Sequence, residues 1–154
     1  MAGVCCFTGH RKIEERDLKK LKKDLISTLE NLIENEGIEE FRTGGALGFD
    51  TLAADAVLFL KQTYPQIKLV IYVPCMDQNK YYSAEQNQKY LFHINSADKI
   101  LCISQHYYKG CMLERNRALV NGADVCIAYK RKNEGGTAYT VSYAEQNAVK
   151  TIIL

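Results

Sequence analysis

Long hydrophobic runs are missing from this sequence. No apolar stretch approaches the roughly 20 residues that a transmembrane helix needs, so we expect no membrane partner. The first ten residues, MAGVCCFTGH, contain an apolar patch but lack the basic region and cleavage site of a secretory signal. We interpret them as the start of a first strand. Linkers, low-complexity segments and internal repeats are absent too. The 154 residues therefore predict one domain, 1–154, with a sizeable core.

The sequence also lacks a large excess of positive or negative charge, and it lacks the cysteine and histidine spacings typical of metal sites. The formal net charge is +2, too small to indicate nucleic-acid binding by itself. The six cysteines include no CxxC or CxxH pair, so no metal site is expected. Cys75 and Cys111 fall in predicted loops, where a passive thiol is favoured over a reactive one. The others lie in apolar strand candidates, which favours buried, reduced thiols in a cytoplasmic protein: Cys5, Cys6, Cys102 and Cys126.

Hydrophobic periodicity predicts a regular alternation of strands and helices. The strands begin roughly every 30 residues, the length of a βαβ unit. This predicts an α/β fold, a single Rossmann-like domain with a mostly parallel sheet and helices on both faces. Gly37 ends the first helix, Pro74 ends the third strand, and Ser83 with Gln86 forms a capping box. We expect strands at 3–7, 38–43, 68–73, 99–103, 125–129 and 151–154, and helices at about 14–36, 51–63, 83–96, 111–121 and 137–148.

A glycine-rich turn joins the second strand to the second helix. Gly44, Gly45 and Gly48 permit a tight turn whose N–H groups approach a ligand. Asp50 stands at the expected N-cap of the helix. A glycine loop that opens a helix is an anion site, because unpaired N–H groups and the helix dipole point at one spot. Taken alone, the segment fits a tight strand-to-helix turn equally well.

The carboxyl ends of parallel strands lie along one edge of a sheet, where ligands bind. The loops 8–11, 43–45, 104–110 and 130–136 are therefore expected to face a single crevice. A second glycine turn, Gly135-Gly136-Thr137, also enters a helix there, and its threonine either contacts a phosphate or caps the helix. Two convergent anion loops favour phosphate binding over a purely structural role.

The fourth helix adds polar residues to this crevice. Arg115 and Arg117 are separated by about 200° around a helix, so one is expected to face the ligand and the other the surface or a partner. The guanidinium group of arginine can bind a phosphate or a carboxylate through two parallel hydrogen bonds. Glu114 and Asp50 are acids near the predicted crevice, suited to a ribose hydroxyl, an arginine or acid–base chemistry. Several tyrosines are expected nearby, for packing or for stacking on a nucleobase: Tyr81, Tyr82, Tyr107, Tyr108 and Tyr139.

In combination, these motifs resemble the SMF/DprA–LOG (SLOG) superfamily, and within it the YpsA-like branch of small bacterial proteins. The resemblance covers essentially the whole chain. It implies a Rossmann-like fold that binds nucleotides or nucleotide-derived ligands, with ADP-ribose and NAD-type molecules as the proposed ligands. The motifs that carry it are Thr8-Gly9-His10-Arg11, the segment GGALGFD from Gly44 to Asp50, Glu114-Arg115-Asn116-Arg117 and Gly135-Gly136-Thr137.

The LOG enzymes of that superfamily imply an alternative function, hydrolysis of the N-glycosidic bond of nucleoside monophosphates. They use motifs like MHERK and PGGxGTxxE. The segment MLER ending at Arg115 resembles the first. The second is matched only in part, because Glu134 replaces the proline and Ser142 takes the place of the glutamate. Glu145 and Glu114 are the substitutes, and this departure favours a binding or sensing role over an enzymatic one.

The DNA-processing relatives imply a third function, binding of single-stranded DNA. They carry similar glycine and RNR segments. Few positive charges are available to contact DNA phosphates: Lys130-Arg131-Lys132, Arg11 and Lys12. The small size of YpsA-like proteins also suggests a homodimer.

The sequence and the resemblance together assign roles at the crevice. The glycine and threonine residues hold phosphates, Arg11 and Arg115 supply positive charge, and Asp50 caps the second helix or orients a ribose. The expected ligand-binding set is Thr8, Gly9, His10, Arg11, Gly44, Gly45, Gly48, Asp50, Arg115, Asn116, Gly135, Gly136 and Thr137, and the catalytic candidates are Arg115, Glu114 and Glu145.

Overall fold

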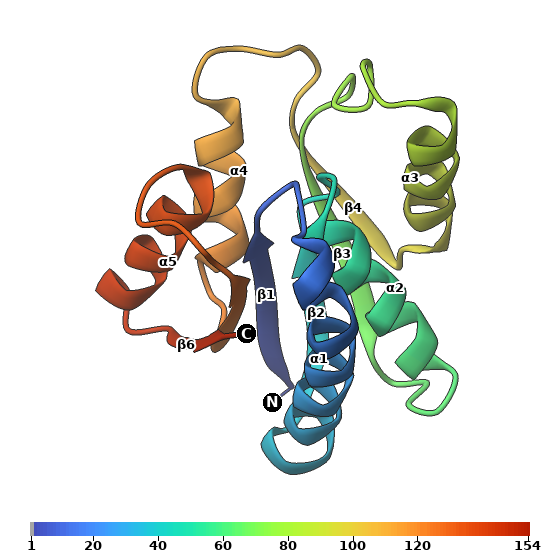
Figure 1. Cartoon of the computed structure of the whole chain (residues 1–154), viewed down its shortest axis with the longest axis vertical. Helices are drawn as coiled ribbons and strands as arrows, with labels where there is room; N and C mark the ends of the chain where they lie inside the picture. Colours follow the sequence, from blue (N-terminus) through green and yellow to red (C-terminus); the bar gives the residue numbers. More distant parts are fainter. Residues whose placement is uncertain (1) are drawn as a thin grey trace.

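The computed structural model, which describes residues 2–154, alternates strands and helices along the chain (Figure 1). Each predicted element is present, with small shifts at its ends. The strands are β1 (Gly3–Gly9), β2 (Ile38–Thr43), β3 (Lys68–Cys75), β4 (Lys99–Ser104), β5 (Val125–Tyr129) and β6 (Lys150–Ile153). The helices are α1 (Glu15–Glu36), α2 (Phe49–Lys61), α3 (Ala84–Ser96), α4 (Cys111–Val120) and α5 (Gly136–Gln146).

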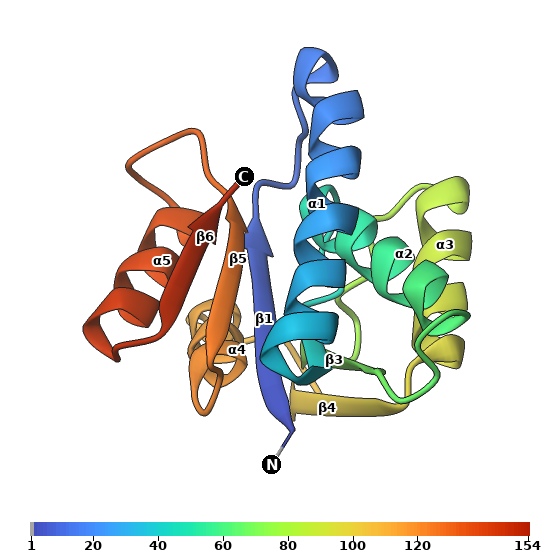
Figure 2. The same cartoon turned by 90° about the horizontal axis from the view of Figure 1, so that it is seen from below.

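The six strands form one sheet in the order β4-β3-β2-β1-β5-β6, and all neighbouring strands are parallel. The predicted α/β fold is thus confirmed. The chain builds outward from β1 to β4 and then returns through α4 to place β5 beside β1. Helices α1, α2 and α3 lie on one face of the sheet, and α4 and α5 on the other (Figure 2). The strand order reverses between β1 and β5, which is where such sheets leave a crevice at their carboxyl ends.

Three strands are longer than their sequence patterns predict, β4 by a single residue and β1 and β3 by two residues each. Thr8 and Gly9, expected in a loop, extend β1 because β5 offers pairing partners alongside both. β3 continues through Pro74, which we expected to end it. The pairing of β3 with β2 stops at Ile71, so the missing N–H of Pro74 leaves no ladder bond to β2 unmade.

Helix ends follow the predicted signals more closely. Gly37 closes α1 in a left-handed conformation, with φ of 66°. The capping box of Ser83 and Gln86 is present at the start of α3. Helix α2 ends at Lys61, two residues before the expected end at Thr63. Among residues 2–154, no helix combines the length and the apolar character needed to cross a membrane.

The cysteines differ from expectation at three positions, although all six have free thiols. Those of the central strands β1 and β5 are buried as predicted, but Cys102 is exposed because β4 is an edge strand. Cys75 is the last residue of β3 rather than a loop residue, and Cys111 is the first residue of α4, where that helix was expected to begin; both are buried. Burial and the neighbouring Asp77 raise the pKa of Cys75 to about 11. Its thiol therefore stays protonated and unreactive at neutral pH.

The close approach of β1 to α2 requires a glycine at the end of β1. A Cβ atom on Gly9 would lie 2.4 Å from Cβ of Phe49, and Phe49 is fully buried among aromatic rings. Gly9→Ala should therefore lower the free energy of unfolding by about 3 kcal/mol, because the core cannot absorb the extra methyl group without moving α2. Chemical denaturation checks this value. Gly136→Ala is the control, since its Cβ would meet nothing nearer than 3.8 Å; equal effects of the two changes would contradict the packing argument.

Candidate functional site

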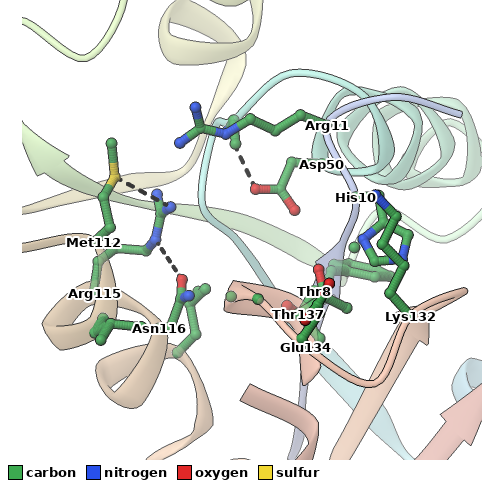
Figure 3. Close-up of a pocket in the computed structure, with 17 residues that line it drawn as sticks. Thr8, His10, Arg11, Asp50, Met112, Arg115, Asn116, Lys132, Glu134 and Thr137 are labelled. Carbon is green, nitrogen blue, oxygen red and sulfur yellow. Dashed lines mark hydrogen bonds between the residues drawn. The ribbon is translucent and has the colours of Figure 1, made fainter. Parts of the chain in front are cut away.

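A cavity of about 380 Å³ opens at the carboxyl ends of β1 and β5, where the strand order reverses. Ligand pockets typically have volumes of about 300–1,000 Å³. Figure 3 shows its walls, with residues of α4 on one side and residues of β1 and the turn before α5 on the other. The lining residues are Phe7, Thr8, Gly9, His10, Arg11, Ala46, Asp50, Met112, Leu113, Arg115, Asn116, Leu119, Lys132, Glu134, Gly135, Gly136 and Thr137.

The N-terminus of α5 faces this cavity without a cap. Gly135, its N-cap residue, makes no side-chain hydrogen bond, so the first N–H groups of the helix lack the usual partner. Gly136 and Thr137 line the cavity, and Thr8 of β1 lines it as well; both threonines are buried. Free N–H groups and the positive end of the helix dipole make this turn suitable for an anion.

Arg115 projects from α4 into the cavity wall and is only 4% exposed. Its Nη1 donates to the carbonyl oxygen of Gly44 at 2.5 Å, and also lies 3.3 Å from the Tyr72 carbonyl and from Oε1 of Gln78. Nε donates to Oδ1 of Asn116. Nη2 has a weak contact of 3.9 Å with the Met112 sulfur. Protein oxygens thus accept hydrogen bonds from Nε and Nη1 of the guanidinium, and Nη2 is the donor that remains for a ligand.

The sequence predicts Asp50 as the N-cap of α2, and this prediction is wrong. The N-cap is Gly48, with φ of 77°, and Asp50 is the second residue of the helix. Its carboxylate turns back and accepts a hydrogen bond from the N–H of Ala46 at 3.2 Å. Burial raises the pKa of Asp50, while the charge of Arg115 and nearby backbone N–H groups lower it. The side chain is 6% exposed and lines the cavity.

The glycines before α2 do not line this cavity, although we expected them to contact phosphate. Gly44 is enclosed by the protein's own charges: a Cβ atom there would lie 2.6 Å from Nη1 of Arg115 and 2.9 Å from Oδ2 of Asp50. Gly48 packs against the loop after β1, and a Cβ atom on Gly48 would lie 2.3 Å from the Arg11 carbonyl oxygen. The carbonyl of Gly45 accepts a hydrogen bond from Tyr82. Close packing therefore accounts for these three glycines.

The rim of the cavity is basic. Arg11 and Lys132 are exposed and line it. His10 also lines it, and its Nε2 accepts a hydrogen bond from the N–H of Arg131 at 2.7 Å. Burial and the charges of Lys132, Arg131 and Lys130 lower the pKa of His10. The imidazole is therefore neutral at pH 7, with its proton on Nδ1, and it ties the loop after β1 to the loop after β5.

The structure brings together ten of the thirteen expected ligand-binding residues, all except Gly44, Gly45 and Gly48. Two catalytic candidates lie outside the cavity: Glu114 is exposed on α4, and Glu145 is exposed near the far end of α5. Arg117 faces away and donates to the Tyr139 hydroxyl at 3.0 Å, which agrees with the predicted angle from Arg115. No group of three or more His, Cys, Asp or Glu residues in the described part of the chain is arranged for a metal ion.

Sequence reasoning missed seven lining residues. Lys132 was noted only as part of a basic run, and Glu134 only as a departure from a motif. Met112 and Leu113 belong to the MLER segment and Ala46 to GGALGFD, but these motifs did not identify them as lining residues. Helical spacing places Met112, Leu119 and Arg115 toward one side of α4. The missed residues are Phe7, Ala46, Met112, Leu113, Leu119, Lys132 and Glu134.

The fold and cavity define a Rossmann-like α/β protein with its crevice at the reversal of strand order. The model of the YspA SLOG family (YpsA) matches residues 5–152, and the chain belongs to this family. Two relatives are the uncharacterized SPbeta prophage-derived protein YoqJ of Bacillus subtilis and a UPF0398 protein of Shouchella clausii. YoqJ is 31% identical over 139 residues, which cover 82% of this chain and 81% of YoqJ. The second is 35% identical over 129 residues, 81% of this chain and 68% of that protein.

Two solved structures of DNA processing protein A share the fold. The protein from Helicobacter pylori, described for its single-stranded DNA binding mode, aligns with a TM-score of 0.69 at 20% identity. DprA from Streptococcus pneumoniae aligns with a TM-score of 0.70 at 19% identity. The alignments cover 98% and 99% of this chain, but only 64% and 50% of those chains. At these identities the likeness concerns the fold.

The effect of replacing Arg115 on the free energy of unfolding should depend on the charge of Asp50. Arg115→Met should lower the free energy of unfolding by about 3 kcal/mol at pH 7, because it leaves a buried carboxylate without its compensating charge. It also removes a cause that lowers the pKa of Asp50. The folded variant will then bind this proton at a higher pH than the folded original protein does. Its stability deficit relative to the original protein should shrink as the pH falls from the pKa of Asp50 in the variant to the pKa of Asp50 in the original protein, which is itself raised above 3.8.

Denaturation curves at a series of pH values measure this deficit. The matched control is the double variant Asp50→Asn with Arg115→Met, which has no carboxyl group to titrate at this position. Measured against the single variant Asp50→Asn, which also lacks this carboxyl group, the deficit of the double variant should not change over the same pH range. A deficit of Arg115→Met that grows as the pH falls would contradict the coupling.

Proposed function

We propose that this protein binds or senses a nucleotide-derived phosphate ligand in the cavity between β1, α4 and α5. The observation that carries the proposal is the uncapped N-terminus of α5, which faces a cavity flanked by buried threonines. Thr8 and Thr137 supply hydroxyl groups, and Nη2 of Arg115 supplies a charged donor. Arg11 and Lys132 attract an anion to the rim. Phosphate is the ligand group that uses all of these donors together.

A nucleotide-type ligand such as ADP-ribose, NAD or a nucleoside monophosphate fits this chemistry. Membership of the SLOG family supports the choice, because these proteins are thought to bind such ligands. Asp50 is the acceptor that would pair with a ribose hydroxyl, since its carboxylate lines the cavity. Hydrolysis of the ligand is not part of the proposal, because Glu114 and Glu145 lie outside the cavity.

Thermal unfolding with a panel of nucleotides tests the proposal. A ligand that binds only the folded protein stabilises it by about 2.7 kcal/mol at 100 times its Kd, and a chain of this size gains roughly 2–4 °C per kcal/mol. AMP, ADP-ribose or NAD should therefore raise the Tm by several degrees. Lys132→Ala should weaken binding about tenfold by removing a phosphate contact. Lys130→Ala is the control, because Lys130 pairs with Asn133 outside the cavity. No shift with any of these ligands at millimolar concentration would refute the proposal.

Single-stranded nucleic acid is a second candidate ligand, favoured by a basic cavity beside the first. This cavity, of about 740 Å³, is lined by the cations Arg11, Lys12, Arg131 and Lys132 and also by two acids, Glu14 and Glu15. Arg131 is already engaged, because its guanidinium contacts Asp17 and the Leu154 carbonyl and stacks 4.3 Å over the Tyr129 ring. Three exposed cations remain for phosphates. The Helicobacter pylori protein, whose fold this chain shares, is described as binding single-stranded DNA.

Three phosphate contacts predict a shallow salt dependence. For a single-stranded oligonucleotide, the logarithm of the binding constant should fall with the logarithm of salt concentration with a slope of about −2. Fluorescence anisotropy with a labelled oligonucleotide gives this slope. Lys12→Ala should reduce its magnitude, whereas Lys109→Ala, away from this cavity, should leave it unchanged. Absence of binding at low salt would remove this candidate.

A further inference from the structure

A separate cavity of about 500 Å³ lies at the same edge of the sheet, lined by residues of the loops after β3 and before α4. Both loops stand at the carboxyl ends of their strands, beyond α3 and α4 (Figure 1). Tyr81, Tyr82 and Tyr107 line this cavity. We call it the tyrosine cavity. Nothing in the phosphate-binding proposal requires it.

The tyrosines of this cavity are unusually open to solvent. Tyr81 is 88% exposed and Tyr107 is 63% exposed, so packing of the core does not account for either ring. Tyr82 is held in place, since its hydroxyl donates to the Gly45 carbonyl and its ring meets Tyr90 edge to face at 5.5 Å. Exposed aromatic rings gathered around one hollow favour a flat apolar ligand group.

The tyrosine cavity adjoins the cavity between β1, α4 and α5, which we call the phosphate cavity. Arg11 and Met112 line both of them. The Met112 sulfur also contacts Nη2 of Arg115, the donor that remains for a ligand. One molecule with an anionic part and a planar part can therefore occupy both cavities and pass between Arg11 and Met112.

We propose that the tyrosine cavity receives the base of the nucleotide whose phosphate lies at the N-terminus of α5. This inference rests on the proposed function and deepens it, because it assigns a place to the base of the nucleotide. Stacking on a tyrosine ring accepts any base, since each base has a π face. The base contributes to affinity through Tyr81 and Tyr107, and the phosphate contributes through α5.

Two ligands that share a phosphoribose separate these contributions. Calorimetry should give AMP a Kd about tenfold lower than that of ribose 5-phosphate, because only AMP carries a base. Tyr107→Ala and Tyr81→Ala should each weaken AMP binding, up to about tenfold, and leave ribose 5-phosphate unchanged. Tyr108→Ala is the matched control, a neighbouring tyrosine that is 40% exposed and does not line this cavity.

A spectroscopic readout tests the location directly. The chain contains no tryptophan, so Tyr107→Trp introduces a single indole whose fluorescence AMP should quench and ribose 5-phosphate should not. If both ligands bind with equal Kd, or if AMP binds without quenching, the tyrosine cavity does not hold the base, although the phosphate site stands. If neither ligand binds, the proposed function itself fails, and this inference fails with it.

Discussion

The packing of Arg115 and Asp50 around the Gly44 peptide determines how the carboxyl edge of this sheet is built. Arg115 donates to the Gly44 carbonyl, and Asp50 accepts from the N–H of Ala46. Two opposite charges are thereby buried around a turn that has no room for a side chain. Buried charges are tolerated only when they are paired and hydrogen-bonded. This requirement joins α4 to the start of α2, although the two helices belong to opposite faces of the sheet.

That arrangement also leaves the two glycine turns with different hydrogen-bonding groups to offer a ligand. The glycine turn before α2 resembles a phosphate loop in sequence, but its carbonyl and N–H groups already serve Arg115 and Asp50. The turn before α5 has no such internal partner, and its N-cap Gly135 makes no side-chain hydrogen bond. The two glycine motifs therefore have different roles. The first positions Arg115, and the second presents free N–H groups to the cavity.

Much of the fold was predictable from the sequence, because apolar periodicity and helix caps are local signals. The element order, the parallel sheet and the caps at Gly37 and Ser83 are examples. The errors arose where tertiary contacts override local preference. Asp50 carries the composition of an N-cap, but Gly48 takes that position and the Asp50 carboxylate accepts a hydrogen bond from the Ala46 N–H instead. Cys102 lies in an apolar strand, but its exposure depends on the position of β4 at the sheet edge. The grouping of Thr8, Arg115 and Gly136 followed from topology, whereas the apolar residues of α4 that line the cavity depend on how the helix packs.

Arg11 links the parts of this edge into one surface. It lines the phosphate cavity, the tyrosine cavity and the basic cavity, and it is exposed. An arginine at such a junction can pair with a phosphate or stack on a base. A ligand that enters from any of the three cavities therefore meets the same cation.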